Sequence, residues 1–189
     1  MKQERFTTHK IVFIALMAAL VYVLTLFRFP LLNSKVHFAN AMCLLSGLLL
    51  GPVGGGLAAG IGSGLYDLVG GYGLDGVIIT IVSKFLMALI CGLIAKTVHE
   101  TQMPKTEAHL RVTLGSIIGA LSYVALYMLK TVVYQAFVYG YPAETVWATA
   151  LSKLPASLIN AVFAMIVTPI LYAALRSPLE KTGLLEKMR

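Results

Sequence analysis

Three lysines lie inside long apolar stretches of the sequence, where a charged side chain is unexpected: Lys84, Lys130 and Lys153. If these stretches cross a membrane, each lysine costs about 3 kcal/mol to insert unless it faces protein or a watery cavity. Each lies about eight residues from the end of its stretch that is predicted below to face outward, a depth of about 12 Å in a helix. Three ammonium groups at one depth predict a shared ligand cavity. The alternative is that each lysine extends separately to the membrane surface.

Polar and aromatic side chains repeat at helical spacing around each lysine. In one stretch, Tyr127, Lys130 and Tyr134 come four, seven and eleven residues after Tyr123, which places all four on one helix face. An aromatic stripe can also serve helix packing, but lysines and hydroxyl groups at matching depth favour a small-molecule pocket. The pattern comprises Thr80 and Lys84 in one stretch, Tyr123, Tyr127, Lys130 and Tyr134 in the next, and Lys153, Ser157 and Asn160 in the last.

Patterns for catalytic or metal chemistry are missing from the sequence. An intramembrane serine protease needs a Gly-x-Ser motif and a histidine on another helix, but Ile61 stands two residues before Ser63. The four histidines, at positions 9, 37, 99 and 109, lack the spacing of a metal site. A channel and a complete secondary transporter are disfavoured as well, because the sequence lacks charged rings and long inverted repeats. We expect a non-enzymatic protein with no catalytic residues, metal or cofactor.

The composition indicates which elements must position these side chains. Of 189 residues, 58% are hydrophobic and 12% are charged, with a mean hydropathy of +0.84, whereas about a quarter of a soluble domain is charged. The net charge of +7 does not indicate nucleic-acid binding, because the basic residues are not clustered on one polar segment. We predict a single all-α membrane domain over residues 1–189, a bundle of six transmembrane helices. The predicted helices cover about 11–27, 36–50, 53–69, 76–95, 112–138 and 145–175.

The distribution of lysine and arginine predicts the orientation in the membrane. Ten of these residues fall on the side that holds both termini and the loop at 96–111, and two fall in the opposite loops. Cytoplasmic loops carry the excess of Lys and Arg, so both termini are predicted to be cytoplasmic. The polar segment 27–37, which contains Pro30, then lies outside, either as a lid over the pocket or as a plain connector.

Glycine is concentrated in one part of the chain. Twelve of the seventeen glycines lie between Gly47 and Gly76. Gly56, Gly60 and Gly64 form two consecutive GxxxG steps, which predict close helix packing in a membrane. Phosphate binding is disfavoured, because no Gly-Lys-Ser/Thr motif follows the glycines.

The alanine pair Ala15 and Ala19 and a set of short motifs lie within residues 11–175. The motifs are Val36-His37-Phe38-Ala39-Asn40, Leu48-Leu49-Leu50-Gly51-Pro52, Gly60-Ile61-Gly62-Ser63-Gly64-Leu65-Tyr66-Asp67-Leu68, Ser83-Lys84-Phe85-Leu86-Met87-Ala88, and Leu154-Pro155 followed by Asn160. Together they resemble the substrate-binding S components of energy-coupling factor (ECF) vitamin transporters. The resemblance implies a six-helix bundle that binds a vitamin from outside and associates with a transmembrane coupling subunit and two cytoplasmic ATPase subunits.

The resemblance also implies roles for individual residues. Ala15 and Ala19 would contact the coupling subunit, and the substrate would bind among the last three helices beneath the loop at 27–37. Combined with the pattern of lysines and tyrosines, the predicted substrate-binding residues are Lys84, Tyr127, Lys130, Tyr134, Lys153, Asn160, His37 and Asn40.

The substrate and the mode of transport are predicted with alternatives. The overall pattern is most similar to the branch associated with hydroxymethylpyrimidine and pyridoxine-like vitamins, whereas the lysines would suit an anionic vitamin such as pantothenate. The sequence has no ATP-binding motif, so ATP-driven uptake would need partner chains. A solitary membrane facilitator is the further alternative. We expect a multi-pass protein in the plasma membrane of a prokaryote.

Overall fold

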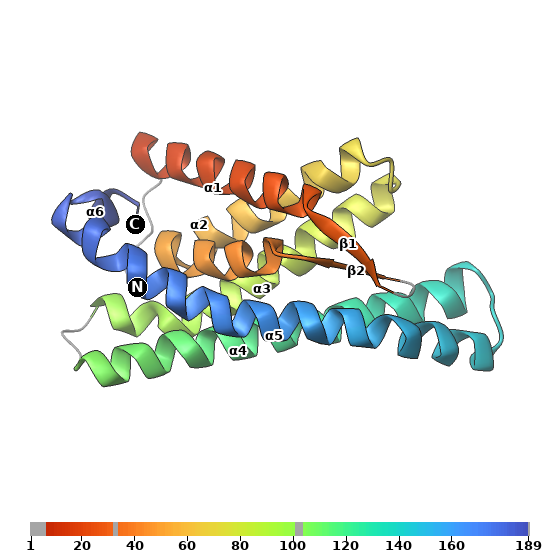
Figure 1. The fold of residues 1–189 in the computed structure, drawn as a ribbon. Coiled ribbons are helices and arrows are strands. Elements are labelled where there is room, and N and C mark those ends of the chain that lie inside the picture. The colour runs from red at the N-terminus through yellow and green to blue at the C-terminus, as the bar shows by residue number, and fades with distance from the viewer. Residues whose placement is uncertain (1–6, 32–33, 101–103, 189) are drawn as a thin grey trace.

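The computed structural model describes residues 7–31, 34–100 and 104–188 as an almost wholly helical bundle (Figure 1). Among these residues, five helices are long and apolar enough to cross a membrane. They are α1 (Thr8–Leu26), α2 (Ala39–Val69), α3 (Leu74–Glu100), α4 (Lys105–Val133) and α5 (Ala143–Lys181). The shorter elements are β1 (Arg28–Leu31), β2 (Ser34–His37), the π-helical turn η1 (Tyr134–Val138) and α6 (Leu184–Lys187).

Helix α2 contains two of the predicted helices and folds back on itself at Gly51. This residue has φ 80° and ψ 176°, a conformation that glycine adopts far more readily than other residues, and Pro52 follows it. Ser46 Oγ donates a hydrogen bond of 2.9 Å to the carbonyl of Gly55, although these residues would lie about 13.5 Å apart in an unbroken helix. The two halves of α2 therefore lie side by side. The count of six membrane crossings stays a prediction, since it requires each half to cross separately.

Glycines allow α2 to pack backbone to backbone against its neighbours. A Cβ added at Gly47 would overlap the carbonyl oxygen of Ala88 in α3, so only glycine fits at this approach. The close helix packing predicted from the GxxxG steps is confirmed. All three glycines of these steps face residues of α3: Gly56, Gly60 and Gly64.

An antiparallel β-hairpin connects α1 to α2. Its register places Arg28 opposite His37 and Leu31 opposite Ser34. The predicted helix start at residue 36 is therefore wrong, because residues 36 and 37 pair with β1 and α2 begins at Ala39.

The helices extend beyond the apolar segments that predicted them. Helix α3 continues to Glu100, α4 begins at Lys105 and α5 continues to Lys181. The predicted loop at 96–111 is thus helical over most of its described residues. Hydropathy marks the part of a helix that suits the membrane, whereas the helix itself ends where its backbone hydrogen bonds end.

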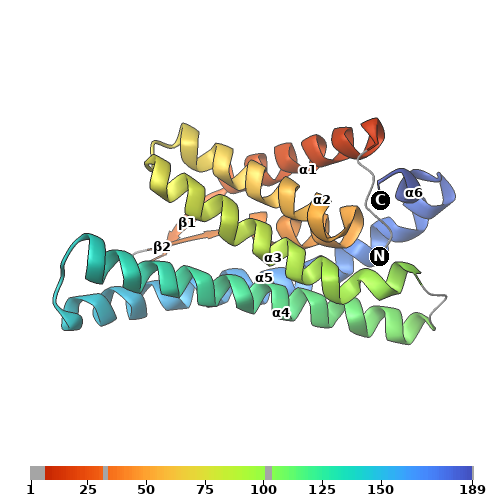
Figure 2. The same cartoon turned by 180° about the vertical axis from the view of Figure 1, so that it is seen from behind.

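The connections divide the bundle into two ends. Figures 1 and 2 show the start of α1, the end of α5 and helix α6 at one end, which we call the terminal end. The β-hairpin and the turn between α2 and α3 lie toward the opposite end, the hairpin end. Helices α1, α2 and α3 form one side of the bundle, and the antiparallel pair α4 and α5 forms the other.

Candidate functional site

A cavity of about 480 Å³ lies toward the hairpin end, lined by the β-hairpin and by residues of α1 to α5. Its volume falls within the roughly 300–1,000 Å³ typical of small-molecule sites. The lining includes six tyrosines (Tyr66, Tyr72, Tyr123, Tyr127, Tyr134 and Tyr139), five cationic side chains (Arg28, Lys35, Lys84, Lys130 and Lys153), two carboxylates (Asp67 and Asp75), and the polar residues His37, Ser157 and Asn160.

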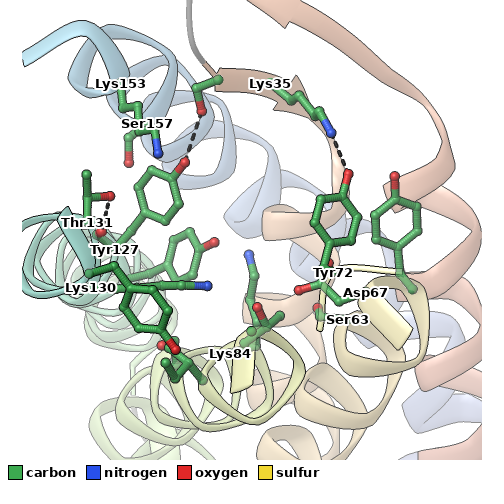
Figure 3. A pocket seen from close by; sticks show the side chains of 18 of the residues that line it. Lys35, Ser63, Asp67, Tyr72, Lys84, Tyr127, Lys130, Thr131, Lys153 and Ser157 are labelled. Atoms are coloured by element: carbon green, nitrogen blue, oxygen red, sulfur yellow. Dashed lines mark hydrogen bonds between the residues drawn. The ribbon is translucent and has the colours of Figure 1, made fainter. Parts of the chain in front are cut away.

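Lys84 points into the cavity from α3 (Figure 3) and is only 3% exposed. Its ammonium group donates a hydrogen bond to Oδ1 of Asn40 and lies 3.6 Å from the centroid of the Tyr123 ring. A buried cation needs such partners, because burial removes its hydration. Asn40 itself is buried outside the lining, so the structure assigns it to holding Lys84 in place.

Asn160 of α5 fixes the position of β2. Its Oδ1 accepts a hydrogen bond of 2.8 Å from the backbone N–H of His37, and its Nδ2 donates one of 2.8 Å to the carbonyl of Lys35. One side-chain amide thus bonds two backbone groups of the same strand. Although Asn160 lines the cavity, its amide is engaged by the hairpin.

Two tyrosines bind the hairpin from other elements. The hydroxyl of Tyr72, in the turn between α2 and α3, accepts hydrogen bonds from Arg28 at 2.9 Å and Lys35 at 2.5 Å. The bond from Lys35 is the main reason that the pKa of the Tyr72 phenol is lowered. On the opposite side, the hydroxyl groups of Ser34 and Tyr127 lie 3.3 Å apart. The hairpin is therefore fastened to α4, to α5 and to the turn that precedes α3.

His37 presents a neutral imidazole to the cavity. Burial, and then the positive charges of Lys84 and Arg28, lower its pKa to about 3, so it is uncharged at physiological pH. Its Nδ1 atom is buried and has no hydrogen-bond partner among the described residues, and the same is true of Ser157 Oγ. Buried polar atoms are normally paired, so each of these two atoms has an unused capacity for a hydrogen bond.

Two further lysines face the cavity from α4 and α5 (Figure 3). Lys130 lies 5.7 Å from the centroid of the Tyr134 ring. Within the described part of the chain, neither Lys130 nor Lys153 has a hydrogen-bond or ion-pair partner. The Tyr134 hydroxyl donates a hydrogen bond of 2.8 Å to Asp75, which joins the ends of α3 and α4.

The cavity thus combines aromatic surface with positive charge. The rings of Tyr123 and Tyr127 are stacked with their centroids 6.1 Å apart and an interplanar angle of 23°. Tyrosine rings provide flat apolar surface, and their hydroxyl groups provide hydrogen bonds. Five cations face two carboxylates, so the arrangement suits a polar, partly aromatic small molecule. Among the described residues, no group of three or more His, Cys, Asp or Glu side chains could hold a metal ion.

The structure brings together seven of the eight residues predicted to bind substrate. They are Lys84, Tyr127, Lys130, Tyr134, Lys153, Asn160 and His37, and Asn40 lies behind Lys84. Their contact with a ligand stays a prediction.

The sequence pattern did not identify Arg28, Tyr66 or Tyr72 as parts of the site. Arg28 and Tyr72 come from the segments between helices, where no helical periodicity connects them to the lysines. The signal that could have found them is the presence of charged and aromatic residues in both connections at the predicted outer side.

Comparisons with known proteins agree with this architecture. A family model described as "ECF-type riboflavin transporter, S component" matches residues 5–177. A solved structure described as "Structure and mechanism of the S component of a bacterial ECF transporter" is similar with a TM-score of 0.64 and 19% sequence identity. The match covers 90% of this chain and 96% of that chain, and at this identity it shows a shared fold. A search of curated proteins finds no match.

Proposed function

We propose that this chain, which belongs to the family of ECF-type transporter S components, captures a small water-soluble vitamin with a planar heteroaromatic ring. The vitamin would enter from outside the cell, and a partner module would drive its uptake with ATP. The observation that carries this proposal is the cavity of about 480 Å³, whose lining includes both the stacked rings of Tyr123 and Tyr127 and His37, which has a buried Nδ1 without a partner among the described residues. A planar ring would lie against Tyr127, and its polar edge would pair with the neutral imidazole.

A flavin is the first candidate for the vitamin. The description of the matching family model names riboflavin, and the cavity has room for more than one ring. Hydroxymethylpyrimidine and pyridoxine-like vitamins remain candidates because they also offer a flat ring with polar substituents. Pantothenate, which has no ring, would use the lysines more than the tyrosines.

The orientation proposed for this function follows the distribution of basic residues. If the two halves of α2 cross separately, the chain crosses the plasma membrane of a prokaryotic cell six times and both termini are cytoplasmic. The cavity and the hairpin would then face outward, where the vitamin arrives.

Helix α1 supports the proposed association with a coupling subunit. Ala15 and Ala19 lie one turn apart and are both exposed. Packing inside this bundle is therefore not the reason for their small size. Small residues on an exposed membrane face allow another helix to approach closely, so we assign this face to the coupling subunit. That subunit would connect the chain to two cytoplasmic ATPase subunits.

The experiment that tests this function identifies the bound molecule directly. The protein is purified in mild detergent and denatured, and the released small molecules are identified by mass spectrometry. Riboflavin, hydroxymethylpyrimidine, pyridoxine and pantothenate are then titrated into ligand-free protein by calorimetry. We expect one vitamin to bind, and a folded protein that binds none of them and releases no small molecule would contradict the proposal.

A variant connects the binding to the cavity. Tyr127→Ala should weaken binding about tenfold, which corresponds to about 1.4 kcal/mol, through loss of stacking area. Tyr141→Ala is the matched control, because Tyr141 is 49% exposed and lies outside the lining. Uptake into vesicles that contain this chain without the ATPase module would instead favour a solitary facilitator.

A further inference from the structure

The five cations of the cavity fall into two groups according to their contacts. Arg28 and Lys35 donate hydrogen bonds to Tyr72. Lys84 bonds Asn40 and lies over the Tyr123 ring. Lys130 and Lys153 have no hydrogen-bond or ion-pair partner among the described residues. The structure thus gives three of the cations a hydrogen-bond partner and leaves Lys130 and Lys153 without one among the described residues.

Both of these lysines line the same cavity, Lys130 from α4 and Lys153 from the neighbouring helix α5 (Figure 3). Two like charges near each other in a partly buried site are unfavourable unless an anion joins them. The two carboxylates of the cavity offset only part of the charge of its five cations. Asp75 accepts the hydrogen bond from Tyr134, and Asp67 lies across the cavity beside Tyr72 (Figure 3).

Ser157 adds a neutral donor at the same place. It lies one helical turn after Lys153 on α5, and Figure 3 shows the two side chains next to each other. The residue is 5% exposed, lines the cavity, and its Oγ has no hydrogen-bond partner among the described residues. An unpaired buried hydroxyl costs about 1–3 kcal/mol, so a bound group that accepts its hydrogen bond would be stabilised.

We infer that Lys130, Lys153 and Ser157 form an anion subsite that receives a phosphate or carboxylate group of the substrate. Such a group would accept hydrogen bonds from both ammonium groups and from the serine hydroxyl, and charge-assisted bonds of this kind are the stronger ones. A neutral vitamin would leave both lysines without an anion as hydrogen-bond partner. The inference rests on the proposed function and narrows it to the anionic members of the substrate class.

The test compares ligands that differ in one anionic group. The phosphate arm compares riboflavin 5′-phosphate with riboflavin, and pyridoxine 5′-phosphate with pyridoxine. The carboxylate arm compares pantothenate with panthenol, in which an alcohol replaces the carboxylate. Dissociation constants are measured by calorimetry on the ligand-free, full-length protein. In at least one pair we expect the anionic member to bind at least about tenfold more tightly than the neutral one, a difference of about 1.4 kcal/mol. The arm in which this occurs shows whether the subsite receives a phosphate or a carboxylate.

Variants then locate the effect. Lys130→Met and Lys153→Met should each remove most of the difference in affinity within the preferred pair. Ser157→Ala should reduce the difference by a smaller factor. Lys181→Met is the matched control, since Lys181 is exposed and lies at the terminal end. If a methionine variant fails to fold, the glutamine variant at the same position replaces it.

Three results would overturn the inference, and they have different meanings for the function. If a neutral member binds at least as tightly as its anionic partner in every pair that binds, the subsite is refuted while the vitamin-binding function stands. If the folded protein binds no compound and releases none on denaturation, the function fails and the inference fails with it. A preserved preference in both lysine variants would show that these lysines only extend to the membrane surface.

Discussion

Helix α2, together with the faces of α1 and α3 that pack against it, is built differently from the pair α4 and α5. We call the first region the packed side and the second the cavity side. Within the most apolar stretch of α2, 83% of residues are buried, whereas in α5 the share is 28%. Helix α2 meets its neighbours through glycines that leave no space for a side chain. Helices α4 and α5 instead direct tyrosine, lysine and serine side chains into a cavity. On the packed side, the choice of residues is limited by the volume available between the helices. On the cavity side, it reflects the chemistry of the molecule that binds.

This contrast predicts different consequences for substitutions of similar size. On the packed side, a larger side chain that points into the bundle should impair folding. A larger side chain on the outer face should impair association with a partner subunit. On the cavity side, removed groups should affect binding and leave the fold intact. Lys84 belongs to both sides, because it lines the cavity and also satisfies a buried group of α2.

The largest expected effect is the loss of uptake when the exposed face of α1 is enlarged. Ala15→Trp or Ala19→Trp should abolish uptake in cells, because an indole blocks the close helix approach that small residues permit. Ligand binding by the isolated protein should remain, since both alanines are exposed. Binding is measured by calorimetry, and association by pull-down of the coupling subunit from the same preparation.

A control separates this effect from a general effect of tryptophan in the membrane. Ile170→Trp places the same indole on an exposed position of α5, where Ile170 is 62% exposed, and should leave uptake intact. Loss of ligand binding together with uptake in the α1 variants would contradict the assignment of this face to a partner.

The second prediction concerns a glycine on the inward side. Gly47→Ala should destabilise the protein by about 3 kcal/mol, as overpacking does, because the new Cβ would overlap the carbonyl oxygen of Ala88. Gly76→Ala is the matched control, since the nearest atom to its added Cβ is 3.8 Å away. Denaturant unfolding in detergent gives both values. Equal stability of the two variants would mean that the close backbone contact between α2 and α3 does not limit the size of the side chain at position 47.

Much of the fold could be predicted because membrane helices repeat a simple pattern. Apolar length located the helices, and the spacing of Gly56, Gly60 and Gly64 identified the close packing with α3. The hairpin could not be predicted in this way. Its strands are four residues each, and the side chain of Asn160, far away in the sequence, holds β2 in position.

The site was predictable to the extent that helical periodicity defines it. The stripe that contains Tyr127 and Lys130 follows from a repeat of 3.6 residues, and the structure places both residues at the cavity. The roles of Asn40 and Asn160 were not predictable, because an amide bonds whichever neighbour the fold supplies. Tyr72 was missed for a related reason, since its partners come from another connection.

The third prediction compares two lysines of the cavity. Lys84→Met should reduce stability by about 2 kcal/mol, because Oδ1 of buried Asn40 would lose its donor and an unsatisfied buried group is costly. Lys153→Met should leave stability nearly unchanged, because no described residue depends on its ammonium group. Thermal unfolding in detergent measures both. The double variant Lys84→Met with Asn40→Leu should recover part of the lost stability. A Lys84→Met protein as stable as the unmodified one would show that Lys84 does not stabilise the packed side.

The smallest expected effect concerns the contacts that fasten the hairpin over the cavity. Tyr72→Phe removes the oxygen that accepts hydrogen bonds from Arg28 and Lys35. Two exposed bonds of this kind contribute about 1 kcal/mol together, so the bound vitamin should dissociate about fivefold faster. Competition stopped-flow with the vitamin found by mass spectrometry measures the dissociation rate. Tyr141→Phe is the matched control, since it removes a hydroxyl at the hairpin end outside the cavity lining. If Tyr72→Phe binds and releases the vitamin at unchanged rates, the hairpin is a plain connector and another element controls access to the cavity. Faster exchange at nearly constant stability would instead show that access is controlled where the hairpin meets the turn before α3. This turn lies on the border between the packed side and the cavity.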